Sequence, residues 1–176
     1  MKDNPKLAGI TVKSISEKLR KAALQKYNLY GSEWIKAYFD KFSGGYNVYH
    51  KKHQFASAGG GGEAEKIVGK LLAKYNGKQV EFLSEGGNKS ADLLFDEQTW
   101  DIKYIDNANE KTIRGHIEDA RKADNAIFYF TKEEKYLLLK SAVEREKGKL
   151  LKGQSSKMPN IYFMDKTGLL ILLWKK

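Results

Sequence analysis

The chain has 176 residues, of which 41% are apolar and 31% charged, and its formal net charge is +10. A chain of this length forms one domain, or one domain with an extension, and has enough apolar residues to bury a core. No apolar run reaches the ~18–20 residues that cross a bilayer, and no apolar segment after the first five residues predicts a secretory signal. The absence of cysteine excludes disulfide bonds, a thiol nucleophile and cysteine-based metal sites.

The positive charge is concentrated in the first third of the chain. Residues 1–55 contain 11 Lys and Arg against 4 Asp and Glu, a balance of +7, and residues 56–176 contain 21 against 18, a balance of +3. This distribution favours an anionic partner such as a nucleic acid, a membrane surface or an acidic protein. A solvated lysine-rich surface is the alternative, and charge alone does not separate the two.

The first 62 residues predict helices followed by a loop. Apolar residues at three-to-four spacing indicate a helix over 11–30, and Ser32 is a candidate cap for a second helix over 32–42. The glycine-rich segment that follows has no hydrophobic period and is expected to be a loop. We therefore expect residues 1–57 to form a basic, mostly helical extension or linker, and residues 58–176 to form the main domain.

Regular hydrophobic patterns continue to the end of the chain. An amphipathic helix over 63–75 is expected to bury Ala64, Ile67, Val68, Leu71 and Leu72. A capping box that begins at Asn107 predicts the start of another helix, which ends near residue 122. The remaining predicted elements are strands over 79–83, 90–95 and 99–105, a buried strand over 126–130, a helix over 132–151, and strands over 160–164 and 169–174. This order predicts an α/β fold with a mixed central sheet flanked by helices.

The strand over 99–105 carries the first candidate site residues. Successive side chains of a strand point to opposite faces, so Asp101 and Lys103 share one face and lie about 6–7 Å apart. That separation allows a carboxylate to bind a divalent metal while an ammonium group stands beside a substrate. A solvent-facing charge pair is the alternative interpretation of this short pattern.

Further acids precede this strand. Asp92 opens the previous strand, and because neighbouring strands lie ~4.8 Å apart, Asp92 and Asp101 are expected to converge on one ion. Glu63 or Glu65 of the preceding helix is a candidate third carboxylate, and Glu65 is preferred because it shares a face with Val68. Hard oxygen ligands predict Mg²⁺ or Mn²⁺, with Zn²⁺ as an alternative.

A helical Glu, a strand Asp and a strand Asp-x-Lys, followed by a helix and a buried strand, resemble the PD-(D/E)xK nuclease superfamily. Residues 62–130 match the α-β-β-β-α-β order of its restriction-endonuclease-like core. The resemblance implies metal-dependent cleavage of phosphodiesters. It assigns Asp92, Asp101 and Glu65 to the metal, and Lys103 to the attacking water or the phosphate. Residue 91 is Ala, where the name of the motif has Pro.

A narrower resemblance covers most of residues 46–176. The segments YHKKHQF, GGGGEAEKIVGKLLAKYNGKQVEFL, SADLLFDEQTWDIKYI, TIRGHIEDARKADNAIFYF and GLLILLW are similar to the C-terminal tRNase domains of contact-dependent growth-inhibition toxins. The resemblance implies a domain of a larger delivery protein that cleaves tRNA in the cytoplasm of a target bacterial cell. It also implies a cognate immunity protein, which we expect to be acidic. A DNA endonuclease of the same fold and a non-catalytic phage or secretion-particle module are the alternatives.

The helix after Asn107 carries candidate substrate contacts. Arg114 and Arg121 recur on one helical face, with His116 and Lys122 nearby, and these four residues are expected to bind the nucleic-acid backbone. An exposed helix with an internal Arg–Glu pair is the alternative. His50 and His53 lie in a segment that is expected to be a basic loop touching phosphates, with a zinc site as the less favoured interpretation.

Overall fold

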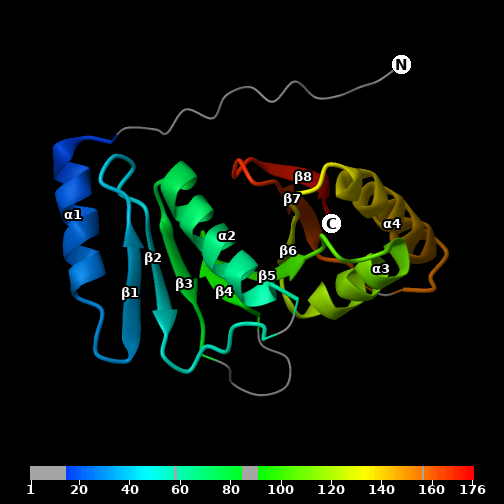
Figure 1. The fold of residues 1–176 in the computed structure, drawn as a ribbon, viewed down its shortest axis with the longest axis horizontal. Helices are drawn as coiled ribbons and strands as arrows, with labels where there is room; N and C mark the ends of the chain where they lie inside the picture. The colour runs from blue at the N-terminus through cyan, green and yellow to red at the C-terminus, as the bar shows by residue number, and fades with distance from the viewer. Residues whose placement is uncertain (1–14, 58, 85–90, 156) are drawn as a thin grey trace.

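The structure is a computed structural model that describes residues 15–57, 59–84, 91–155 and 157–176. The chain folds as a mixed α/β protein in which the strands form one sheet in sequence order, β1 to β8 (Figure 1). The helices are α1 (Glu17–Asn28), α2 (Gly61–Asn76), α3 (Glu110–Asp119) and α4 (Glu134–Leu151), and a 3-10 turn, η1 (Ala120–Lys122), follows α3. The strands are β1 (Trp34–Phe39), β2 (Tyr46–His50), β3 (Gln79–Phe82), β4 (Leu93–Phe95), β5 (Gln98–Tyr104), β6 (Asn125–Tyr129), β7 (Asn160–Met164) and β8 (Leu170–Trp174).

Both strand orientations occur in the sheet. β3, β4 and β5 pair antiparallel, and the short turn between β4 and β5 accounts for the second of these pairings. β5, β6 and β7 pair in parallel, and so do β2 and β3, because helices or long connections return the chain to the same end of the sheet. The α/β class and the mixed sheet predicted from the sequence are confirmed.

The prediction of a second helix over residues 32–42 is wrong, because residues 34–39 of this segment form strand β1. The segment expected to be a loop contains strand β2, which pairs with β1 on one side and with β3 on the other. Residues on both sides of the expected boundary at 57 and 58 therefore build one sheet. The helix predicted from residue 11 is observed as α1, and residues 11–14 lie outside the described part.

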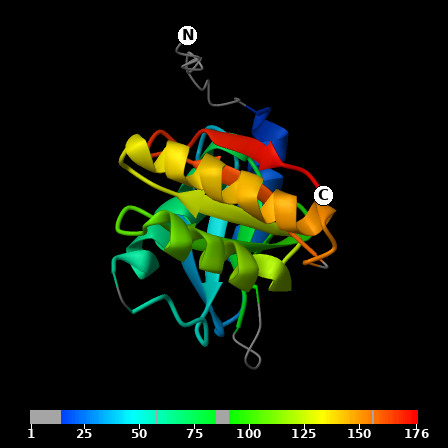
Figure 2. The ribbon, with the colours of Figure 1, turned by 90° about the vertical axis from the view of Figure 1, so that its right-hand side faces the viewer.

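The core has two halves, one on each face of the sheet. α2 covers the half that includes Val68, Phe82 and Trp100, and α3 and α4 cover the half that includes Ile113, Phe128 and Leu139. Figure 2 shows α3 and α4 side by side across one face of the sheet. β6 serves both halves, since Ile127 packs in the first and Phe128 in the second, as the alternation of a strand requires.

Close packing fixes α2 on the sheet. A Cβ atom at Gly69 would lie 2.5 Å from Cε2 of Phe82, so only glycine allows the helix to approach β3 this closely. Ala64, Val68 and Leu72 are buried as predicted, but Ile67 is 42% exposed because it lies on the outer side of the helix. The predicted strand over 90–95 begins at Leu93, with residue 90 outside the described part, and α3 is capped by Asn109 instead of the expected Asn107.

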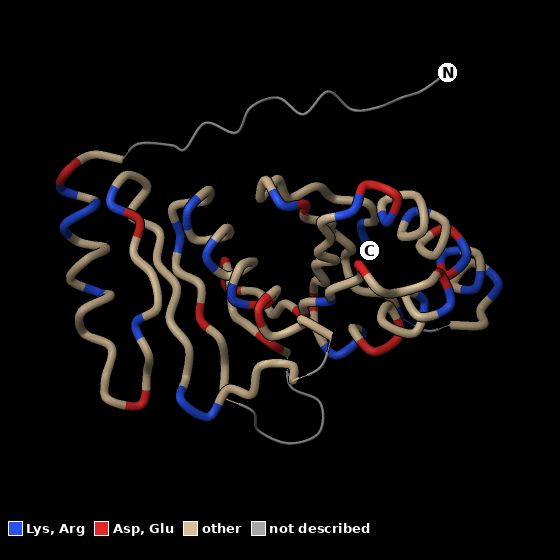
Figure 3. The backbone as a smooth tube through the Cα atoms, viewed as in Figure 1, with Lys and Arg blue, Asp and Glu red and all other residues tan. Residues whose placement is uncertain are grey.

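Charged residues are distributed along the described chain, with Lys or Arg on α1, α2 and α4 (Figure 3). Within the described residues, no helix combines the length and the apolar character that crossing a bilayer requires.

Candidate functional site

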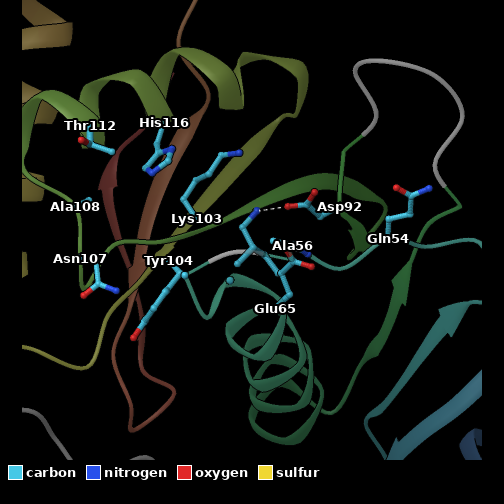
Figure 4. A pocket seen from close by; sticks show the side chains of 13 residues that line it. Gln54, Ala56, Glu65, Asp92, Lys103, Tyr104, Asn107, Ala108, Thr112 and His116 are labelled. Carbon is cyan, nitrogen blue, oxygen red and sulfur yellow. Dashed lines mark hydrogen bonds between the residues drawn. The ribbon is translucent and has the colours of Figure 1, made fainter.

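A cavity of about 510 Å³ lies beside β5, where α2 and α3 approach the same region of the sheet (Figure 4). Glu65 enters it from α2, Asp92 from the residue before β4, Lys103 from β5 and His116 from α3. The structure thus brings together residues from four segments that are up to 51 positions apart in the chain. Figure 4 shows Lys103 and His116 on one side of the cavity and Asp92 and Glu65 on the other.

Asp101 lies behind this cavity and is fully buried. Its Oδ2 atom is 2.8 Å from Nζ of Lys103, and its Oδ1 atom is 3.0 Å from Nζ of Lys122. The same Lys122 ammonium lies 4.0 Å from Oδ1 of Asp92. The Lys122 ammonium therefore stands between the carboxylates of Asp92 and Asp101.

Asp92 is held against the edge of β5. The backbone N–H of Ile102 donates a hydrogen bond of 2.6 Å to its Oδ2 atom. Burial and the negative charge of Asp101 raise the pKa of Asp92 to about 7, although the Ile102 N–H and Lys122 oppose this rise. The charge of Glu65 contributes in the same direction as that of Asp101, so the three carboxylates act on one another.

Glu65, and not Glu63, is the helical acid that faces the cavity. Glu63 is 74% exposed at its side chain and pairs with Lys66, one turn along α2. Glu65 is buried, and its Oε1 atom accepts a long hydrogen bond of 3.4 Å from the backbone N–H of Ala56. The helical face that Glu65 shares with Val68 thus directs it toward the sheet, as the sequence predicted.

His53 is a buried residue that the sequence interpretation missed. Residues 51–53 form a turn and loop as expected, but the His53 side chain is only 2% exposed and does not lie on a solvated basic surface. Nδ1 lies 2.8 Å from the carbonyl oxygen of Leu83, and Nε2 lies 3.6 Å from Oε2 of Glu65. Burial lowers the pKa of His53, but the combined effect of Glu65 and the Leu83 carbonyl is larger and opposite. The pKa of His53 is therefore above its ordinary value. The one feature of the sequence that indicates a buried position here is the aromatic residue Phe55, two positions later. Its ring packs edge-on against that of His53.

Two of the four expected substrate contacts face away from the cavity. Arg114 donates through Nε to Oε1 of Glu146 at 2.9 Å, and Nη2 of Arg121 lies 4.0 Å from Oε2 of the same residue. Glu146 belongs to α4 and is buried, with Lys149 as a further partner at 2.8 Å. The expected backbone-binding face of α3 therefore packs on α4. These contacts place Arg114 and Arg121 beside Glu146 of α4, and neither side chain is among the residues that line the cavity.

Replacing Arg114 by alanine is expected to destabilise the fold and leave nucleic-acid binding unchanged. The change removes a hydrogen bond to the buried Glu146 carboxylate, whose remaining partners are Lys149 and the more distant Arg121. We expect the melting temperature to fall by about 2–4 °C. Thermal denaturation and tRNA binding by fluorescence anisotropy measure the two effects. A large loss of tRNA affinity in a variant of unchanged melting temperature would contradict the structural role.

The other two expected contacts lie close to the acids. His116 lines the cavity, and burial together with the charge of Lys103 lowers its pKa, which favours the neutral imidazole at pH 7. Lys122 is directed at Asp101 and Asp92 and not outward. Both residues are placed at the site, and Lys122 is closer to the acids than the sequence indicated.

The donor chemistry of the site fits a divalent cation. Within the described residues, Oε2 of Glu65 is buried without a hydrogen bond, and each carboxylate oxygen of Asp101 is ion-paired with a lysine. The ammonium of one of these lysines, Lys122, already occupies a cation position between Asp101 and Asp92. Among the described residues, no three His, Asp or Glu side chains are gathered tightly enough to enclose a metal. Asp92, Asp101 and Glu65 would hold Mg²⁺ or Mn²⁺ after Lys122 moves away from the pair.

Replacing Asp92 by asparagine is expected to stabilise the metal-free protein at high pH. A carboxyl whose pKa is about 7 in the folded protein and 3.8 in the unfolded chain binds its proton more tightly when folded. Stability is therefore lost as the pH rises from about 4 to 7. Asn keeps the acceptor for the Ile102 N–H and carries no charge.

In EDTA, we expect the melting temperature of Asp92→Asn to match that of the unchanged chain at pH 4. At pH 8 it should be higher by about 4–8 °C, equivalent to ~2 kcal/mol. Circular dichroism melts across this pH range give the difference directly. A variant that is less stable than the unchanged chain at pH 8 would show instead that Lys122 stabilises the Asp92 charge more than Asp101 and burial destabilise it.

The four residues assigned from the sequence to catalysis, Glu65, Asp92, Asp101 and Lys103, all lie at or directly behind one cavity. His116 and Lys122 join them, His53 contacts Glu65 from behind, and Arg114 and Arg121 do not take part. The arrangement places a group of acids that attracts cations next to a lysine and a neutral histidine. Comparisons of the chain with protein-family models, with curated proteins and with solved structures give no match.

Proposed function

We propose that this chain is a metal-dependent endoribonuclease toxin that cleaves tRNA. The observation that carries the proposal is the convergence of Asp92 and Asp101 on one ammonium group, with Glu65 and Lys103 lining the adjacent cavity. The order of α2, β3, β4, β5, α3 and β6 supports a PD-(D/E)xK nuclease core, because it matches the arrangement that the resemblance implies.

Each residue of the site has a role in phosphodiester cleavage. A divalent metal, when bound, supplies Lewis-acid chemistry to a phosphate oxygen. Lys103 reaches the cavity with an ammonium group that stabilises negative charge as it develops on the phosphate. The neutral His116 beside it both donates and accepts hydrogen bonds, which suits a contact to a ribose or a phosphate.

The net charge of +10 supports a polyanionic substrate and an acidic inhibitor. In the proposed setting the domain derives from a larger delivery protein and acts in the cytoplasm of a target bacterial cell. A cognate acidic immunity protein neutralises it in the producing cell. Electrostatic attraction would make the association of that inhibitor fast and sensitive to salt.

The proposal is tested by incubating the purified chain with total tRNA and, separately, with plasmid DNA. Each substrate is exposed to Mg²⁺, Mn²⁺, Zn²⁺ or EDTA at fixed salt. Cleavage of tRNA in Mg²⁺ or Mn²⁺, abolished by EDTA, is the expected result. Nicking of the plasmid with intact tRNA would indicate a DNA endonuclease of the same fold. A folded chain that cuts neither substrate with any metal would favour a non-catalytic module.

A further inference from the structure

His53 and Glu65 form a buried pair at the rear of the cavity. The side chains are 2% and 9% exposed, and the Nε2–Oε2 distance is 3.6 Å. In the part of the chain that the structure describes, neither of these two atoms has a hydrogen-bond partner. A pair of polar atoms buried without other partners is costly unless the two groups stabilise each other.

The contact with Leu83 determines how His53 can interact with Glu65. A carbonyl oxygen only accepts hydrogen bonds, so Nδ1, 2.8 Å from the Leu83 oxygen, carries a hydrogen. The Nδ1 contact turns the opposite edge of the ring, with Nε2, toward Oε2 of Glu65 at 3.6 Å, which is a contact between polar groups longer than a hydrogen bond.

The surroundings hold the imidazole ring in this orientation. Phe55 and Phe82 pack edge-on against it, with ring centroids 4.6 and 5.0 Å from that of His53. On the other side, Oε1 of Glu65 accepts from the Ala56 N–H. The segment before α2 therefore contacts both oxygens of Glu65, Oε1 through a long hydrogen bond and Oε2 through His53, while the residue itself lines the cavity with Asp92 (Figure 4).

We propose that His53 is a positioning residue, which fixes the Glu65 carboxylate in the orientation that a divalent cation in the cavity requires. The inference rests on the proposed function, in which Glu65 is a metal ligand. Groups that orient a ligating carboxylate typically change metal affinity or activity by about 10–100-fold when they are removed. His53 contacts the carboxylate and does not line the cavity, so it acts through Glu65 and not on the substrate.

The test compares His53→Phe, which keeps an aromatic ring between its neighbours, with His53→Gln, which retains an N–H donor. His50→Gln is the matched control, because His50 lies three residues earlier with its ring packed against Trp34. The dissociation constant for Mn²⁺ is measured by calorimetry without nucleic acid, and kcat and KM are measured with tRNA. We expect His53→Phe to weaken Mn²⁺ binding and to lower kcat by about 10-fold each, with KM unchanged.

Two further results separate positioning from simple packing. His53→Gln is expected to recover part of the loss, and His53→Phe is expected to have no further effect on Mn²⁺ affinity in a chain that already carries Glu65→Gln. Melting temperatures identify variants that are merely destabilised. Wild-type Mn²⁺ affinity and kcat in a folded His53→Phe variant, or losses that add fully to those of Glu65→Gln, would overturn the inference.

The outcome is distinguishable from failure of the proposed function. A chain that cleaves tRNA, but whose Mn²⁺ affinity and kcat do not respond to His53→Phe, overturns only the role of His53. A chain that cuts no nucleic acid, but whose Mn²⁺ affinity falls in His53→Phe and recovers in His53→Gln, supports the role of His53 and overturns the nuclease proposal.

Discussion

Replacing Asp101 by asparagine is expected to abolish the metal-dependent cleavage of tRNA. The Asp101 carboxylate is fully buried, and each of its oxygens faces a different lysine ammonium group. The amide of asparagine has no charge to attract a cation and offers one acceptor instead of two. We expect the rate to fall by at least ~10²-fold, with Mn²⁺ affinity reduced in parallel. Single-turnover cleavage at fixed metal and salt measures the first effect, and calorimetry measures the second.

The control for this experiment is Asp96→Asn. Asp96 lies in the turn between β4 and β5, is 57% exposed at its side chain, and has a φ of 53°, which asparagine adopts readily.

Because breaking a buried ion pair costs about 3–5 kcal/mol, Asp101→Asn is also expected to lower the melting temperature. Asp92→Asn is a second test without this complication, since it is expected to stabilise the chain at pH 8 and still remove a proposed metal ligand. Wild-type cleavage by both folded variants would place the active site elsewhere.

The elements from α2 onward were predictable because their hydrophobic patterns are regular and local. The sequence favours a helix where β1 is observed, because Ser32 is a suitable N-cap before this segment. The register of β1 against β2 shifts between Lys36 and Tyr38, and an irregularity of this kind removes the two-residue period of a strand. The pairing of β2 with β3 depends on a crossover through α2, which no short window of sequence reveals.

The site was predictable where its residues lie on adjacent strands. Asp92, Asp101 and Lys103 were identified because strand alternation and strand spacing alone bring them together. His53 was missed because it reaches Glu65 from a segment without regular structure.

The roles of the residues on and after α3 depend on tertiary packing. Arg114 lies on a polar face that solvent or α4 could cover equally well, and only the position of Glu146, 32 residues later, decides this. Lys122 is the last residue of η1 and its side chain reaches Asp101 of β5, a contact that the sequence alone does not reveal.

The two lysines that contact Asp101 are expected to differ in function, although each forms one close ion pair with it. Lys103 lines the cavity from β5, whereas Lys122 stands between Asp101 and Asp92, where a cation would bind. We therefore expect Lys103→Met to lower the cleavage rate by at least ~10²-fold, the size of one electrostatic contact in the transition state. Lys122→Met should lower it by less than ~10-fold, because its ammonium pairs with the acids and does not face the phosphate.

The affinity for Mn²⁺ is expected to change more in Lys122→Met than in Lys103→Met, whereas the cleavage rate is expected to change more in Lys103→Met. Binding of the metal requires the Lys122 ammonium to leave the two acids, so Lys122→Met removes a competing cation and should tighten Mn²⁺ binding more than Lys103→Met does. Methionine keeps most of the apolar length of lysine, and both variants lose one positive charge, so each serves as the control for the other. Calorimetry with Mn²⁺ and single-turnover cleavage of tRNA give the two rankings. The opposite result would be that Lys122→Met loses more activity than Lys103→Met and also binds Mn²⁺ more weakly. Lys122 would then assist catalysis and metal binding, and the assignment of Lys103 to the phosphate and of Lys122 to the acids would be wrong.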